Sequence, residues 1–158
     1  MQIGLRDVYF ADITEDSDGN ETYGTPYKGS EAMTADISMT SNNTPVYGDD
    51  HLVMDIPDNG KGTLSIGITD LLTGVLQKLT GATIDANGAL VAADTDMPGP
   101  KAVGFRSLKA NGNYRYFWFY RVTFAIPNVS LETKGEKTNV KTPSIVGTFT
   151  PRNKVDAF

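Results

Sequence analysis

The residues best suited to chemistry lie around the single histidine of the chain. His51 follows Asp49 and Asp50, and an imidazole beside carboxylates can act as a general base or bind a metal ion. A serine hydrolase would also need a Gly-x-Ser-x-Gly elbow, and an imidazole metal site would need a second histidine. The sequence has neither. We therefore expect His51 to be a surface or contact residue and the chain not to be an enzyme.

Two short segments each resemble part of a ligand-binding motif. Asp16, Asp18 and Asn20 surround Gly19, but an EF-hand loop needs its glycine at the sixth position and a glutamate at the twelfth. Segment 59–63, Asn-Gly-Lys-Gly-Thr, lacks the spacing with which a phosphate-binding loop wraps an anion. Both are predicted to be turns, with weak cation binding left open at the first. We expect no cofactor and no metal.

An aromatic run, 114–120, reads Tyr-Arg-Tyr-Phe-Trp-Phe-Tyr and is followed by Arg121. Aromatic rings next to arginines can stack nucleobases, but a buried strand of a β core explains the same pattern. Strict alternation places Trp118 and the tyrosines on one face and Phe117 and Phe119 on the other. Because both faces carry aromatic side chains, both are expected to be covered.

The composition is that of a soluble globular protein. The chain has 158 residues, 39% hydrophobic residues and no cysteine, which suits one domain spanning 1–158 with a single core and excludes disulfides and thiolate metal sites. No apolar run approaches the roughly 20 residues that cross a bilayer, so we expect no membrane insertion of this chain. The first residues do not resemble a secretion signal, and synthesis in the cytosol is expected.

The periodicity predicts a mainly β protein. Runs with period-two alternation are separated by turn dipeptides such as Asp18-Gly19, Asn87-Gly88 and Asn111-Gly112. The expected strands are 5–13, 32–40, 63–68, 103–109, 114–126 and 138–150. On the second of these, Met33 and Met39 fall on the face predicted to be buried. The fold class is a β-sandwich or a partly closed β-barrel.

One helix and one long loop complete the expected organisation. A helix is predicted at about 70–80, capped by Thr69, closed by Gly81 and packed against the sheet. Segment 41–61 is interrupted by prolines, glycines and asparagines, and a loop is expected there. Its apolar residues need a surface to pack on, either their own domain or a neighbouring copy.

Five segments, in order along nearly the whole chain, resemble the phi13-type major tail proteins of long, flexible-tailed bacteriophages. They are Ile3–Tyr9, Tyr23–Pro26, Gly104–Tyr116, Thr133–Glu136 and Lys141–Phe149. The resemblance implies a tail-tube subunit that assembles into hexameric rings, which stack into a hollow tube for DNA ejection. It also implies a location in the virion, after assembly in the host cytoplasm, and as partners the tape measure, distal tail and tail terminator proteins.

The resemblance gives the loop at 41–61 a role as an assembly loop that reaches an adjacent subunit or ring. The candidate contact residues are Val46, Tyr47, Asp49, Asp50, His51, Leu52 and Met54. The alternative function is a carbohydrate- or receptor-binding β-sandwich of a phage particle, with Trp118 and the tyrosines as its platform. The predicted burial of Trp118 counts against that alternative.

Charge is unevenly distributed along the chain. Residues 1–100 contain 16 acids and 4 bases, a net charge of −12, whereas residues 101–158 contain 10 bases and 3 acids, a net charge of +7. The bases are scattered singly, which favours pairing within the chain or between copies over direct nucleic-acid binding. In a tube, an acidic lumen would repel phosphates, so we expect DNA to pass as non-adhesive cargo.

Overall fold

The computed structural model describes residues 2–70, 72–91, 93, 97–127 and 142–152. The beginning of the last predicted strand and the motif at 133–136 lie outside these residues. The elements are β1 (Gln2–Glu15), β2 (Glu21–Tyr23), β3 (Tyr27–Lys28), β4 (Ala32–Gly48), β5 (His51–Ile68), α1 (Thr73–Thr80), β6 (Thr83–Ile84), β7 (Leu90–Val91), β8 (Lys101–Lys109), β9 (Tyr114–Phe124) and β10 (Ser144–Phe149). The predicted mainly β fold with one flanking helix is confirmed.

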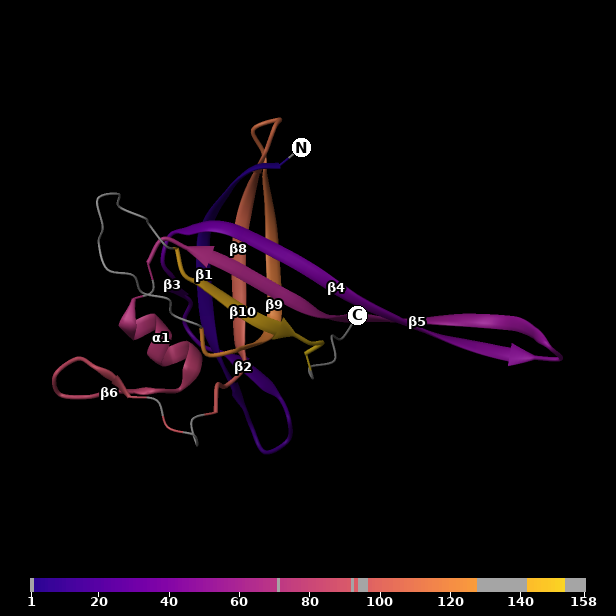
Figure 1. Ribbon diagram of the computed structural model, residues 1–158, viewed down its shortest axis with the longest axis horizontal. Helices are drawn as coiled ribbons and strands as arrows, with labels where there is room; N and C mark the ends of the chain where they lie inside the picture. Colours follow the sequence, from indigo (N-terminus) through magenta and orange to yellow (C-terminus); the bar gives the residue numbers. More distant parts are fainter. Residues whose placement is uncertain (1, 71, 92, 94–96, 128–141, 153–158) are drawn as a thin grey trace, which may run out of the picture.

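One antiparallel sheet forms most of the molecule. Its strand order is β2-β1-β8-β9-β10-β5-β4, β3 pairs with β1, and β6 and β7 form a separate hairpin. The sheet bends so strongly that β4, β5 and β10 cross the direction of β1, β8 and β9 (Figure 1). Residues of β1 and β4 come into contact, although no ladder joins these two strands in the described residues.

The core lies inside this bend and is closed on one side by α1. β1, β5, β8, β9 and β10 each contribute two or three side chains and the helix contributes two, whereas β4 contributes only partly buried alanines at its edge. The buried cluster is Val8, Phe10, Leu64, Ile66, Ile68, Val75, Leu79, Val103, Phe105, Val122, Phe124, Ile145 and Phe149. The bend thus lets a single sheet bury one face against itself.

The helix is shorter than predicted at its beginning. It starts at Thr73, and Leu72 occupies the N-cap position without a side-chain cap. Thr69 instead donates its hydroxyl to the carbonyl of Glu31 at 3.3 Å, which ties the end of β5 to the start of β4. The other end is as expected, because Gly81 has the left-handed conformation, φ 76°, that ends a helix.

Three hairpins share one turn design. Gly19, Gly88 and Gly112 have φ values of 78°, 82° and 81°, and the amide of each donates to the carbonyl three residues before it. This is a type I turn followed by a left-handed glycine, a three-residue loop. The predicted turn positions are therefore right, but the two-residue turn expected at Asn111-Gly112 is wrong.

The segment 41–61 is not the irregular loop that the sequence predicted. β4 and β5 remain paired across it, for example Thr44 with Ile56 and Val46 with Met54. The two strands leave the body and continue as a two-stranded ribbon, which projects far beyond the rest of the sheet (Figure 1). We call residues 41–60 the arm.

The arm tolerates residues that normally interrupt strands because it is only two strands wide. Pro45 lies opposite Asp55, and Pro57 lies opposite Asn43. In such a ribbon each strand has one outer edge, where a proline without an N–H removes no ladder hydrogen bond. Proline and asparagine were therefore poor signals for a loop at these positions.

The tip of the arm offers a direct test of this geometry. Asp49 and Asp50 both have positive φ, 49° and 62°, as the two central residues of a type I′ turn require. Asp50→Gly is expected to stabilise the arm by about 0.5 kcal/mol, since glycine adopts this conformation without a Cβ clash. Amide exchange at the arm should then slow about twofold. Asp50→Ala removes the same charge but keeps the Cβ, and slower exchange in that variant would contradict the explanation.

Candidate functional site

The arm brings all seven predicted contact residues to its outer end. Val46, Tyr47 and Met54 are 42%, 69% and 58% exposed, and the aspartates form the tip. His51 is exposed, with its Nδ1 3.2 Å from the carbonyl oxygen of Asp49. The backbone of Leu52 is described but its side chain is not. The arm therefore presents apolar side chains to solvent at a distance from the core.

The strand that leads into the arm is also uncovered. β4 is the last strand of the sheet order, so among the described residues no strand pairs with its outer edge. Met33 and Met39 are 55% and 61% exposed, so the predicted burial of their face is wrong. Ala35 on this face is partly buried against the core, but Met33 is the extra residue of a register shift between Ala32 and Thr34. A long edge strand with exposed apolar residues favours pairing with another chain.

Ion pairs connect the acidic and basic parts of the chain. The pairs named here join acids before residue 100 to bases after it, because β1 pairs with both β2 and β8, and β8 pairs with β9. The pairs are Arg106 with Asp7, Lys101 with Asp12, and Arg121 with both Glu15 and Glu21. Part of the uneven charge is thus neutralised by ion pairs within one molecule, which supports the expected intramolecular pairing.

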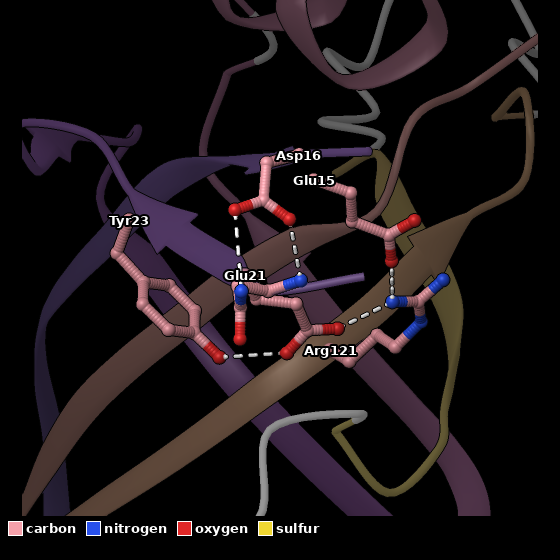
Figure 2. Close-up of polar contacts among 6 residues, drawn as sticks. Glu15, Asp16, Glu21, Tyr23 and Arg121 are labelled. Atoms are coloured by element: carbon pink, nitrogen blue, oxygen red, sulfur yellow. Dashed lines mark hydrogen bonds and ion pairs between the residues drawn. The ribbon is translucent and has the colours of Figure 1, made fainter. Parts of the chain in front are cut away.

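The most buried of these charges is Glu21, whose side chain is fully buried. Figure 2 shows its carboxylate between Arg121 and the hydroxyl of Tyr23, which donates to it at 3.2 Å. The carboxylate of Glu15, on β1, also accepts from Arg121, and this hydrogen bond raises the pKa of Arg121. Burial raises the pKa of Tyr23. The cluster fastens the β1–β2 hairpin to β9.

The acidic turn before this cluster is accounted for by turn hydrogen bonds. Asp16 accepts from the backbone amides of Asp18 and Asn20 at 3.0 and 2.8 Å, and the Asn20 amide is the largest cause that lowers the pKa of Asp16. In the described parts of the chain, no three His, Cys, Asp or Glu side chains gather as metal ligands would. The prediction of a turn is confirmed here, whereas the turn predicted at 59–63 is wrong because these residues belong to β5.

The aromatic strand does not lie as the sequence predicted. Lys101 pairs with Val122, but Val103 pairs with Phe119, so β9 contains one extra residue at this point. Such a bulge reverses which side chains face the core. Val122 is buried, whereas Trp118, on the same face by simple alternation, is 53% exposed. The predicted burial of Trp118 is therefore wrong.

A cavity of about 370 Å³ lies beside this exposed indole. Its lining residues are Asp7, Tyr9, Gly104, Phe105, Arg106, Tyr116 and Trp118. A second bulge shapes it, since β1 advances three residues from Arg6 to Tyr9 where β8 advances two. Sequence reasoning missed this cavity because bulges have no clear signature in strands of this composition.

No protein-family model matches the chain, and no curated protein matches it significantly. In the part of the chain that the structure describes, no helix is long and apolar enough to span a bilayer. The features of the chain that bear on its function are therefore the motifs, the arm and the exposed surfaces.

Proposed function

We propose that the chain is a structural subunit that assembles with copies of itself, specifically the major tube subunit of a long, non-contractile phage tail. The observation that carries this proposal is the arm. The arm is a paired two-stranded ribbon with exposed Val46, Tyr47 and Met54, and none of its described side chains belongs to the buried core. Exposed apolar groups on a projecting element gain stability when a partner covers them.

The sheet edges supply a second reason for self-assembly. In the described structure no strand pairs with the outer edge of β4, whereas at the other end of the sheet β2 and β3 pair with only parts of β1. Contact between two unlike edges of neighbouring copies is heterologous, and repeated heterologous contacts close into a ring when the rotation permits. Stacked hexameric rings, as the resemblance implies, would be one such assembly.

We propose that DNA passes through the lumen of the tube without binding to its wall. Asp7, Asp12, Glu15 and Glu21 are already paired with bases of the same chain, so the lumen would owe its acidity to other carboxylates, such as exposed Asp36. The tape measure, distal tail and tail terminator proteins remain the proposed partners, and the virion the proposed location. The proposal includes no catalysis and no cofactor.

Electron microscopy of the purified full chain tests this function. We expect rings or tubes with a central hole at high protein concentration, and sedimentation velocity should show the same particles in solution. The chain should first be tested alone and then with short tubes added as seeds, because nucleation of a ring stack can be slow. A monomer under both conditions would contradict the proposal.

A further inference from the structure

The cavity beside Trp118 has the parts of a small-molecule site that neither the core nor the arm uses. Tyr9, Gly104 and Trp118 lie in one row across β1, β8 and β9, as directly paired residues. Paired residues of neighbouring strands face the same side of the sheet. The central residue of the row has no side chain, which leaves room for the indole of Trp118 to lie over the backbone of β8.

The indole of Trp118 packs against the backbone at Gly104. A Cβ at Gly104 would lie 2.4–2.6 Å from three atoms of the Trp118 ring, so the ring lies directly against the backbone of β8. The ring nevertheless remains 53% exposed. Tyr9 and Tyr116, also in the lining, are 38% and 64% exposed. The cavity therefore offers a fixed flat aromatic surface with further rings beside it.

The polar part of the lining is an ion pair from the next row. The Arg106 guanidinium contacts the Asp7 carboxylate, and both side chains are about one-third exposed. The Arg106 Nε is buried and has no hydrogen-bond partner in the described structure, while the guanidinium carbon lies 4.3 Å from the Tyr114 ring centroid. Asp7 itself has φ 54°, because the β1 bulge turns it toward this arginine. The lining thus combines a planar carboxylate with a planar guanidinium whose charges cancel.

We propose that this cavity binds a neutral hexose unit of a glycan. A pyranose has an apolar face of C–H groups, which packs on an exposed indole, and hydroxyl groups at its rim, which carboxylate and guanidinium groups bind as acceptor and donor. The volume of about 370 Å³ is within the range of small-ligand sites that are mainly aromatic with a few polar groups. A nucleotide fits less well, because the one arginine in the lining is already neutralised by Asp7. This inference does not depend on assembly into a tube.

The chain contains its own reporter for the test, since Trp118 is the only tryptophan. Fluorescence excited at the indole therefore reports on this cavity alone. The probes are tetrasaccharides of glucose, galactose and N-acetylglucosamine, with the corresponding monosaccharides as a second series. We expect at least one tetrasaccharide to give a saturable change in emission and to protect the indole from acrylamide, with half-saturation at about 1 mM or below.

Variants, studied by calorimetry or NMR titration, separate the site from general surface effects. Trp118→Ala is expected to weaken binding about tenfold or more, as loss of a stacking surface does. Asp7→Asn keeps the shape and a residue that tolerates positive φ, and should weaken binding several-fold. Met97→Ala removes an exposed apolar side chain outside the lining and should leave sugar binding unchanged. Gly104→Ala retains the tryptophan but displaces it, and so tests the site even if Trp118→Ala does not fold.

Three results would overturn the inference. One is the lack of a saturable response to every saccharide, and another is equal affinity in the wild type and the Trp118 and Gly104 variants. The third is an emission change that follows protein concentration without any sugar, which would show that a second copy covers the indole. Because rings can form whether or not a sugar binds, failure here would leave the assembly proposal standing.

Discussion

Arg121→Met is expected to lower the free energy of unfolding by about 3 kcal/mol, measured by urea denaturation. The substitution leaves the buried Glu21 carboxylate without its cationic partner, and breaking a buried pair in this way costs about 3–5 kcal/mol. The lower end applies because Arg121 and Glu15 are 23% and 39% exposed, so water replaces part of the lost interaction. Against a total stability of about 5–15 kcal/mol for a domain, this is a large loss.

The origin of the effect can be isolated with two controls. Arg115→Met, at an exposed position of the same strand, should change stability by less than about 0.5 kcal/mol. Combining Arg121→Met with Glu21→Gln should restore part of the loss, because no buried charge remains. A double variant no more stable than Arg121→Met alone would contradict the buried-charge explanation.

Removal of the arm is expected to abolish self-assembly and leave the fold intact. Residues 41–60 would be replaced by Asn-Gly, so that Thr40 and Lys61, which are paired, flank a two-residue turn. The described arm side chains make no part of the buried core. Urea denaturation should therefore show a change of about 0.5 kcal/mol or less, while sedimentation velocity shows only monomer.

Point substitutions make the arm experiment specific. Tyr47→Asp and Met54→Asp place a charge on the exposed apolar positions and should each prevent ring formation. Thr44→Asp adds the same charge to an exposed polar position of the arm and should be tolerated. Rings formed by the arm-deleted chain would show that other surfaces hold the copies together.

Much of the fold was predictable because its signals are local. Glycine after asparagine or aspartate marked three turns, since a left-handed residue is needed there, and Gly81 marked the end of the helix for the same reason. The 3.6-residue spacing of Val75 and Leu79 identified the buried side of α1. These features depend on residues within a few positions of one another.

The errors arose where distant strands decide the outcome. One extra residue in β9 exposed Trp118, and this residue is defined only by the pairing with β8. Likewise, Pro45 and Pro57 are compatible with strands only because nothing pairs with the outer edges of the arm in the described structure. The apolar candidate contact residues could be located from their character in the sequence. The cavity at Gly104 could not be, because it forms only where β1, β8 and β9 lie in register.

The exposed methionines of β4 and the arm have a consequence for oxidative damage. Met33, Met39 and Met54 are each more than half exposed, and the buried cluster contains no methionine. Peroxide converts exposed thioethers to polar sulfoxides. This would make the apolar surfaces that are available to a neighbouring copy more polar and weaken their association. An aged preparation would therefore keep its folded state while its capacity to associate declines, so reducing conditions matter even for this cysteine-free protein.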